Sequence, residues 1–286
     1  MEKHGLKRSM LTIPDALLLP VIRGYTAEAG VRELERVIAA ICRKAACEIA
    51  EGKQRVRLSR ARLTEYLGQP KRREKAGDRP NMVGIANGLA WTSVGGEMLE
   101  IEVAVLPGTG QLQLTGRLGD VMQESARAAL TFIKAHGGEL GIEDGIFKAS
   151  DIHIHVPEGA VPKDGPSAGI TLATAIASAL AHIPVRANVA MTGEISLRGS
   201  VLPIGGLREK LLAALRSGIT VAVIPEENRK DLEEVPQQVR EGLRIVPVKG
   251  AMEALRIALV DFPAKREYQS LVKPQSEAAL SGTLVM

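Results

Sequence analysis

One segment of the sequence carries a serine in a setting that suits nucleophilic chemistry. Residues 162–169 read Pro-Lys-Asp-Gly-Pro-Ser-Ala-Gly, and they connect an expected strand to an expected helix rich in small residues. Proline and glycine favour a tight turn, so Ser167 would lie at the helix start, where free backbone N–H groups and the positive end of the helix dipole could stabilise an oxyanion. The alternative is that Ser167 only caps its helix.

A second segment supplies a base for such a serine. No histidine lies in a recognisable triad motif, so a lysine is the next option, and it must be partly desolvated to lose its proton near neutral pH. Residues 202–212 read Leu-Pro-Ile-Gly-Gly-Leu-Arg-Glu-Lys-Leu-Leu. On a helix, Lys210 falls near Leu207 and Ala214, at the margin of the apolar stripe. A surface lysine whose ammonium reaches into solvent is the alternative interpretation.

The elements that must position these two residues follow an α/β pattern. From residue 151 onward, strand-like and helical runs alternate. The expected strands are 152–156, 189–196, 219–224 and 243–248, and the expected helices are 167–181, 207–216, 227–233 and 252–259. Upstream, strands at 88–94 and 97–106 flank Gly95-Gly96, which predicts a hairpin, and a strand at 112–115 and a helix at 119–135 follow.

A change of pattern near residue 69 indicates two domains. Residues 1–68 read as a small all-α domain, with a helix from Thr26 to about Glu51 whose apolar residues recur at helical spacing. The predicted fold class is therefore α/β, of mixed α+β type, preceded by a small all-α domain. The charged segment 69–79 is the expected linker, residues 80–264 form the larger domain, and 265–286 are expected to be a loose tail.

Composition and charge are those of an ordinary globular protein. Of 286 residues, 45% are hydrophobic and only 2% are aromatic, which argues against a binder that stacks on nucleic-acid bases. Residues 1–79 hold 18 Lys and Arg against 10 Asp and Glu, whereas the remainder holds 19 against 23. The basic part could meet DNA, an anionic ligand or an acidic partner, and a solvated helical surface is the simpler interpretation.

The cellular setting follows from what the sequence lacks and from its cysteines. No signal peptide and no apolar run of membrane-spanning length are visible, so a cytoplasmic protein without membrane contact is expected. Cys42 and Cys47 lie five residues apart in one expected helix, on different faces. A disulfide could not easily join them, which predicts free thiols and a reducing compartment.

Several motifs in order resemble the Lon protease family. The serine segment is followed, 43 residues after Ser167, by Lys210 within Gly-Gly-Leu-Arg-Glu-Lys. The intervening Met-Thr-Gly-Glu-Ile-Ser-Leu-Arg-Gly at 191–199 and the upstream Asp-Ile-His-Ile-His-Val-Pro-Glu-Gly-Ala at 151–160 also fit. The resemblance runs from about residue 83 to 259, and it implies a Lon-type proteolytic domain that is a serine endopeptidase.

The resemblance implies roles for residues of the site. Ser167 would attack the peptide carbonyl, and Lys210 would take its proton and then return it to the leaving amine. Thr192 resembles the family threonine that orients the lysine, and a satisfied strand threonine is the alternative. Asp164 resembles the acidic residue beside the site, which would hold the lysine in an inactive state or only cap the turn.

Further residues concern the substrate groove and a possible metal. Trp91 and Glu102 match positions near the groove of the family, and core packing is the alternative for Trp91. His153 and His155 lie on one face of an expected strand, as metal ligands would. No third ligand is evident and the resemblance implies no metal, so none is predicted.

The first domain resembles the small helical domain that follows the ATPase core in the same family. Residues 30–36 read Gly-Val-Arg-Glu-Leu-Glu-Arg, similar to the second sensor segment, in which Arg32 would touch a nucleotide phosphate. An ion pair of Arg32 with Glu28 or Glu35 is the alternative. The phosphate-binding Gly-x-x-x-x-Gly-Lys-Ser/Thr run is absent, which indicates the C-terminal part of a longer protein. Peptide cleavage would need no cofactor, whereas ATP and Mg would serve the full-length protein.

The resemblance also implies partners, and two other classes of function compete with it. Substrates would be peptides and unfolded, damaged or regulatory proteins, cut inside a homo-hexameric ring. A DNA-binding module is suggested by the basic first 79 residues and would show steeply salt-dependent affinity. A non-catalytic ring scaffold would leave Ser167 inert to acylating reagents. The intact serine and lysine segments favour the peptidase.

Overall fold

The computed structural model describes residues 1–26, 31–70, 79–92, 95–157 and 163–262. The expected tail at 265–286 lies outside the described residues, and so does most of the expected linker at 69–79. Residues 27–30, directly after the expected helix start at Thr26, lie outside them as well. Within the described ranges, no helix combines the length and apolar character that a membrane span needs.

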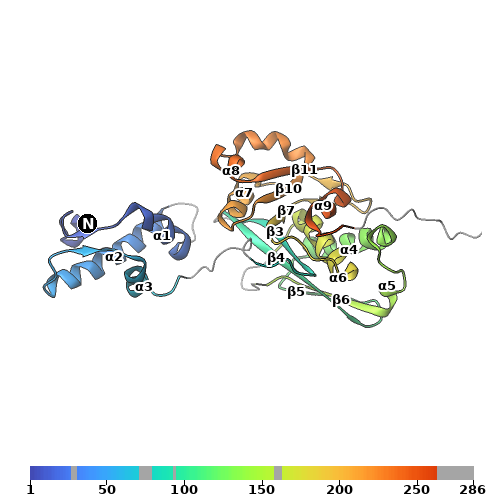
Figure 1. The fold of residues 1–286 in the computed structure, drawn as a ribbon, viewed down its shortest axis with the longest axis horizontal. Helices are drawn as coiled ribbons and strands as arrows, with labels where there is room; N and C mark the ends of the chain where they lie inside the picture. Colours follow the sequence, from blue (N-terminus) through green and yellow to red (C-terminus); the bar gives the residue numbers. More distant parts are fainter. Residues whose placement is uncertain (27–30, 71–78, 93–94, 158–162, 263–286) are drawn as a thin grey trace, which may run out of the picture.

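Residues 1–70 form a small helical part with its own hydrophobic core (Figure 1). Its helices are α1 (Leu18–Tyr25), α2 (Arg32–Ala50) and α3 (Arg60–Leu67), with short 3-10 helices at Glu2–His4 and Asp15–Leu17. The two-residue strands β1 (Leu11–Thr12) and β2 (Val56–Arg57) pair in parallel and are the only departure from an all-helical part among the described residues. Ser59 begins α3 as its N-cap, because its hydroxyl accepts a hydrogen bond from the Arg62 N–H.

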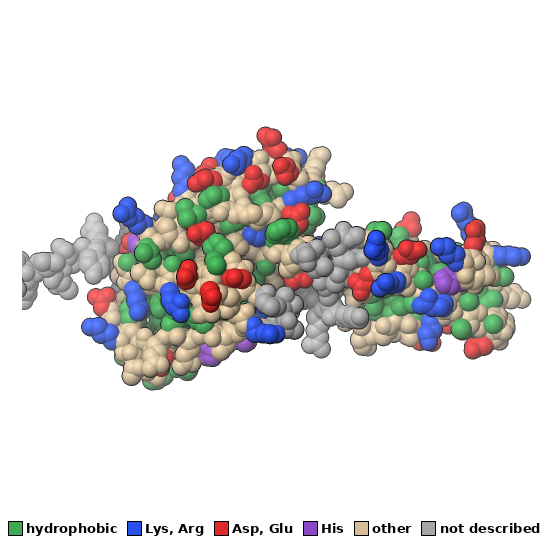
Figure 2. All heavy atoms as spheres, turned by 180° about the vertical axis from the view of Figure 1, so that it is seen from behind, with side chains coloured by type: hydrophobic (Ala, Val, Ile, Leu, Met, Phe, Trp, Pro, Cys, Tyr) green, Lys and Arg blue, Asp and Glu red, His purple; other side chains and the backbone are tan. Residues whose placement is uncertain are grey.

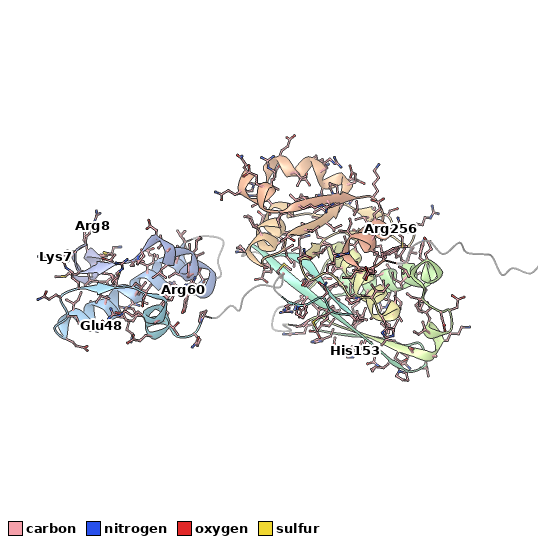
Figure 3. The ribbon with its side chains drawn as sticks, in the orientation of Figure 1. Lys7, Arg8, Glu48, Arg60, His153 and Arg256 are labelled. Atoms are coloured by element: carbon pink, nitrogen blue, oxygen red, sulfur yellow. The ribbon has the colours of Figure 1, made fainter. Side chains whose placement is uncertain are left out.

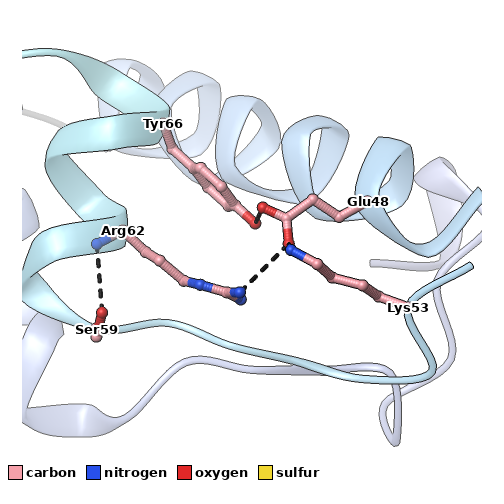
Figure 4. Close-up of polar contacts among 5 residues, drawn as sticks. All are labelled: Glu48, Lys53, Ser59, Arg62 and Tyr66. Atoms are coloured by element: carbon pink, nitrogen blue, oxygen red, sulfur yellow. Dashed lines mark hydrogen bonds and ion pairs between the residues drawn. The ribbon is translucent and has the colours of Figure 1, made fainter. Parts of the chain in front are cut away.

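A carboxylate near the end of α2 connects this helix to α3 (Figure 4). Glu48 accepts hydrogen bonds from Lys53 Nζ and from the Tyr66 hydroxyl, each at 2.7 Å, and the Arg62 guanidinium lies 3.5 Å away. The hydrogen bond from Lys53 is the main cause that lowers the pKa of Glu48. Burial and the hydrogen bond to Glu48 raise the pKa of Tyr66 to about 12. The basic side chains of Lys53 and Arg62 therefore make contacts within the small helical part.

Residues 79–262 are built on a seven-stranded mixed sheet (Figure 1). The strand order is β11-β10-β7-β3-β4-β6-β5, where β4 runs antiparallel to β3 and β6 and the other neighbours are parallel. The strands are β3 (Ile85–Thr92), β4 (Gly95–Pro107), β5 (Leu112–Thr115), β6 (Ser150–His155), β7 (Val189–Met191), β10 (Val221–Pro225) and β11 (Arg244–Val248). A separate antiparallel pair consists of β8 (Glu194–Ile195) and β9 (Val201–Leu202).

Alternate residues of the central strands enter two separate cores, one on each face of the sheet. Met191 and Val223 pack with α4 (Asp120–Ala135), α6 (Gly169–Ala181) and α9 (Ala251–Ala258). Ala190 and Ile224 pack with α7 (Leu207–Arg216) and α8 (Gln237–Gly242). The remaining short elements are 3-10 helices at Gly137–Leu140, Pro166–Ala168 and Glu226–Glu234, and α5 (Ile146–Ala149). Helices α6 and α7 therefore cover opposite faces of one sheet.

The predicted fold class is confirmed, and single elements match closely. The expected helix at 207–216 is α7, and the expected strand at 112–115 is β5. The strand predicted at 189–196 is divided in two, since β7 ends at Met191 and Glu194–Ile195 form β8, which pairs with β9 outside the main sheet. Beyond Met191 the Gly193 N–H donates to the Ser167 carbonyl at 2.8 Å, which draws the chain away from the sheet. Helix α8 was not expected.

The predicted hairpin exists, but its turn lies elsewhere. Gly95 and Gly96 are the first residues of β4 and pair with Thr92 and Trp91 of β3. The connection is therefore at residues 93–94, which lie outside the described residues. Gly96 is required for another reason, because a Cβ there would lie 1.9 Å from the carbonyl oxygen of Glu209 on α7. A close approach between strand and helix, and not a turn, accounts for this glycine.

Candidate active site

Ser167, Thr192 and Lys210 come together at one end of the parallel strands. Thr192 directly follows β7, and β3 and β10, the neighbours of β7, run parallel to it, so their carboxyl ends share this edge of the sheet. Ser167 precedes α6 on one face of the sheet, whereas Lys210 lies in the first turn of α7 on the other. The edge at the carboxyl ends is where open α/β sheets bind ligands.

The serine lies in a 3-10 turn, Pro166–Ala168, that leads into α6. Gly165 enters this turn with φ of 118°, a value that side chains other than glycine's rarely tolerate. The Ser167 carbonyl accepts hydrogen bonds from the Gly193 N–H at 2.8 Å and from Thr192 Oγ1 at 3.2 Å. The backbone of the serine is therefore anchored to the segment that follows β7.

The lysine is buried and hydrogen-bonded. Lys210 is 2% exposed, and its Nζ donates to Thr192 Oγ1 at 3.1 Å. Burial lowers the pKa of Lys210 to about 8, because the low dielectric of the interior disfavours the charged form. A hydroxyl has one proton, so Thr192 donates to the Ser167 carbonyl and accepts from Lys210. This threonine thus links the lysine to the serine segment.

Two N–H groups at the start of α6 are already hydrogen-bonded. The Gly169 N–H donates to the Pro166 carbonyl, and the Ile170 N–H donates to the Gly193 carbonyl at 3.1 Å. Neither group is free to stabilise an oxyanion. The sequence argument treated α6 as an isolated helix, whereas tertiary contact with Gly193 occupies the donor of Ile170.

A cleft of about 340 Å³ opens at this site, and Ser167 and Lys210 both line it. Most of its other lining side chains are apolar, among them Leu89, Trp91, Met98, Leu99, Met122 and Ile204. Trp91 is 61% exposed, and its ring lies against Gly206, where a Cβ would be 2.8 Å from the ring. The expectation that Trp91 is part of a groove thus fits its position better than core packing does.

Asp164 lines the same cleft, but its hydrogen bonds are those of a turn cap. Its Oδ1 accepts from the Met122 N–H at 3.2 Å and from the Gly165 N–H at 2.9 Å. Met122 lies in the first turn of α4, so the carboxylate caps that helix. No hydrogen bond or ion pair between Asp164 and Lys210 occurs in the described structure. Of the two roles expected for Asp164, its contacts favour the cap.

Other residues singled out from the sequence lie apart from the cleft. Glu102 of β4 pairs with Ile85 and His155, and the described residues that line the cleft do not include it. The rings of His153 (labelled in Figure 3) and His155 both contact the Thr115 hydroxyl, at 2.9 and 2.7 Å. Among the described residues, no group of three His, Cys, Asp or Glu side chains is placed to hold a metal.

Arg32 lies in the small helical part, where it is the exposed first residue of α2. Glu28, one of the two glutamates considered as its ion-pair partner, lies outside the described residues. Nothing in the described part of the chain relates Arg32 to the cleft, and its expected role concerns a nucleotide bound elsewhere.

Sequence reasoning missed several cleft residues. Met98 and Leu99 of β4 lie opposite Leu89 and Gly88 of β3. The misplaced turn hid this register, because a turn at Gly95-Gly96 would have paired β4 differently. Ile204 was also missed, although its segment was examined for the lysine. A strand pattern shows which residues alternate, and only the register shows which of them face the serine.

Comparison with known proteins agrees with this geometry. Residues 57–261 match the family model of the Lon protease (S16) C-terminal proteolytic domain, and residues 2–58 match that of the Lon protease AAA+ ATPase lid domain. The chain thus combines a peptidase domain of the serine class with an ATPase lid domain. The chain belongs to the Lon protease family.

Three relatives illustrate the similarity. The chain is 53% identical over 262 residues to a Lon protease of Heliobacterium modesticaldum, covering 91% of this chain and 32% of the relative. It is 52% identical over 265 residues to a Lon protease of Trichlorobacter lovleyi, covering 92% and 32%. It is 54% identical over 271 residues to Lon protease 2 of Herpetosiphon aurantiacus, covering 94% and 33%. The chain spans about a third of the length of the curated relatives it matches.

Proposed function

We propose that this chain cleaves peptide bonds with Ser167 as the nucleophile and Lys210 as the general base. The observation that carries the proposal is the buried ammonium of Lys210, held by Thr192 beside Ser167 in one cleft. A lysine is a useful base only when its surroundings favour the neutral amine, and burial does so here. A lysine without a catalytic role would be expected to keep its ammonium in solvent.

The proposed reaction has two halves. The Ser167 oxygen attacks the peptide carbonyl carbon while its proton passes to neutral Lys210. The tetrahedral intermediate then expels the amine, which takes the proton from the Lys210 ammonium, and an ester to Ser167 remains. A water molecule attacks this ester with Lys210 again as base, so that the acid product leaves and the serine regains its proton.

The cleft suggests how a peptide binds. Strand β3 pairs with β7 only at Asn87 and Gly88, and no other strand pairs with that edge at residues 89–91 within the described structure. These three residues line the cleft next to Ser167. An extended peptide can add to such an edge through its main chain, with alternate side chains directed at the apolar wall. We propose unfolded segments as substrates, because a folded chain does not present an extended strand.

We further propose the setting of the full-length protein. Its ATPase would deliver damaged, unfolded or regulatory proteins to a homo-hexameric chamber in the cytoplasm. ATP and Mg would bind the parts beyond this chain, and Arg32 would contact a nucleotide phosphate. The lid match and the exposed position of Arg32 support this assignment. Glu102 remains a proposed groove residue only for substrates that extend beyond the cleft.

Replacing the nucleophile tests the core of the proposal. Ser167→Ala should lower the hydrolysis of a short blocked peptide by roughly a thousandfold or more, since no other group can form the ester. A fluorophosphonate reagent should add to wild-type protein at Ser167, as peptide mass spectrometry would detect, and should not add to the variant. Equal hydrolysis by both proteins would refute the assignment, and circular dichroism would establish that the variant folds.

A further inference from the structure

A buried asparagine outside the cleft holds the backbone of a residue in the cleft wall. Asn228 lies in the 3-10 helix Glu226–Glu234 that follows β10, and it is 2% exposed. Its Oδ1 accepts a hydrogen bond from the Ile204 N–H, and its Nδ2 donates to the Ile204 carbonyl, both at 2.9 Å. The side-chain amide thus pairs with both main-chain groups of one residue, as a neighbouring strand would.

A carboxylate orients this amide. Nδ2 of Asn228 also donates to Asp231 Oδ2 at 2.6 Å. A carboxylate is only an acceptor, so the NH₂ group must face Asp231 and the Ile204 carbonyl, which leaves Oδ1 for the Ile204 N–H. Each polar hydrogen of the amide is used, and a buried polar group satisfied in this way favours a single arrangement.

The side chain of Ile204 packs against the core beneath α7, but its main chain has few other contacts. Ile204 lies in the link between β9 and α7, next to Pro203, which has no N–H, and Gly205 and Gly206. In the described structure, the hydrogen bonds of its main chain are those with Asn228. Ile204 lines the cleft together with Ser167 and Lys210. The position of this wall therefore depends on Asn228.

The general base is held by different contacts. Lys210 donates to Thr192, and Nη2 of Arg216, in the last turn of α7, donates to the Gly96 carbonyl at 2.8 Å. Helix α7 also packs on the sheet through Leu207, Leu211 and Ala214. Loss of the Asn228 contacts should therefore move the wall while the lysine keeps its surroundings.

We infer that Asn228 is a positioning residue that shapes the peptide-binding wall at Ile204. This inference rests on the proposed function, and it assigns Asn228 to peptide binding and not to the proton transfer. Removal of the amide should weaken the binding of peptides and leave the chemical step and its pH dependence in place.

Kinetics of matched variants test the inference. For a short blocked leucine-rich peptide, Asn228→Ala should raise KM about tenfold, with kcat within about twofold of wild type and the same pH midpoint. The control is Asn87→Ala. Asn87 is also buried, and its side chain donates to the Ala187 and Val189 carbonyls, away from the cleft. The Asn87→Ala variant should have a lower melting temperature than wild type and an unchanged KM.

Exchanging the amide and the carboxylate of Asn228 and Asp231 provides a test even if Asn228→Ala fails to fold. Asn228→Asp alone should be worse than Asn228→Ala, since it places a second carboxylate against Asp231. Adding Asp231→Asn restores an amide–carboxylate pair. The carboxylate at position 228 still accepts from the Ile204 N–H, but it faces the Ile204 carbonyl with an acceptor in place of a donor. The double variant should therefore have a KM between those of wild type and Asn228→Asp.

Peptide affinity provides a second readout that needs no turnover. Trp91 is the single tryptophan of the chain and lines the cleft, so its fluorescence reports peptide binding in a Ser167→Ala background. Asn228→Ala should weaken this affinity about tenfold. An unchanged KM and affinity, or an equal change in Asn87→Ala, would overturn the inference. Absence of Ser167-dependent cleavage in wild type would instead count against the proposed function, and the affinity comparison would still decide on Asn228.

Discussion

At the scale of single residues, the hydroxyl of Thr192 determines what Lys210 can do. Its only proton goes to the Ser167 carbonyl, so Lys210 must be the donor in the bond between Lys210 and Thr192. The lone pair of the neutral amine is then free to accept the proton of the Ser167 hydroxyl. The described structure has no direct hydrogen bond between the two, and such bonds commonly form only when substrate is bound.

The pH dependence of hydrolysis tests Lys210 as the base. Activity should rise with pH with a midpoint near pH 8, because the neutral amine is the active form and burial lowers the pKa of Lys210 to about 8. Lys210→Arg should be as inactive as Lys210→Ala, since arginine stays protonated at every pH of the assay. Substantial activity in Lys210→Arg, without such a titration in wild type, would assign the base to another residue.

The same pKa predicts an effect on stability. The unfolded chain, with a lysine pKa near 10.5, binds the proton more tightly than the folded chain between pH 8 and 10.5. The free energy of unfolding should therefore rise with pH across this window. Lys210→Met should be more stable than wild type at pH 7, and chemical denaturation at several pH values should show this advantage shrinking toward pH 10.5.

At the scale of elements, the end of the β3–β4 hairpin positions α7. Trp91 and Gly96 are opposite each other in the hairpin, and both contact the first turn of the helix. Trp91 lies on Gly206 and Gly96 lies against Glu209, while Arg216 donates to the Gly96 carbonyl. The strand pair that forms one wall of the cleft therefore also fixes the position of Lys210 relative to Thr192.

Gly96→Ala should separate strand and helix. The added Cβ would lie 1.9 Å from the Glu209 carbonyl oxygen, and backbone on both sides must move to relieve this contact. We expect a loss of roughly 1–3 kcal/mol in the free energy of unfolding, as for other overpacked sites, and a fall in kcat from the displaced lysine. Gly145→Ala is the control, since nothing lies within 4 Å of its Cβ. Wild-type kcat in Gly96→Ala would show that α7 does not depend on this approach.

At the scale of the whole molecule, the charged surface of the small helical part bears on the DNA-binding alternative. Figure 2 shows Lys and Arg side chains over the small helical part, with acidic side chains among them. Lys53 and Arg62 contact Glu48, and the side chain of Lys53 is still 52% exposed. The DNA-binding alternative stays a prediction, which the salt dependence of DNA affinity would test.

A division of labour is expected for the chain as it stands. It should hydrolyse short unstructured peptides without nucleotide, because every group of the proposed reaction lies between Trp91 and Lys210. It should fail on a stable folded protein, since unfolding would require the ATPase of the full-length protein. Gel assays with one folded protein and its unfolded, alkylated form would check this, and degradation of the folded form by this chain alone would refute it.

The sequence by itself determined the features that depend on near neighbours. Periodicity predicted α7 at its observed residues, because the amphipathic pattern of this helix is contained within ten consecutive residues. The spacing of glycine and proline around Ser167 predicted a tight turn for the same reason. The order of motifs was sufficient to place the chain in its family before any contact was known.

Only the tertiary structure decided how distant segments meet. Gly96 of β4 lies against Glu209 of α7, more than a hundred residues away in sequence. The Ile170 N–H at the start of α6 donates to the Gly193 carbonyl, Asp164 caps α4, and Asn228 holds Ile204. No sequence pattern near these residues predicts these contacts, because each contact depends on packing across the sheet or between loops. Periodicity along the chain carries no information about such pairs.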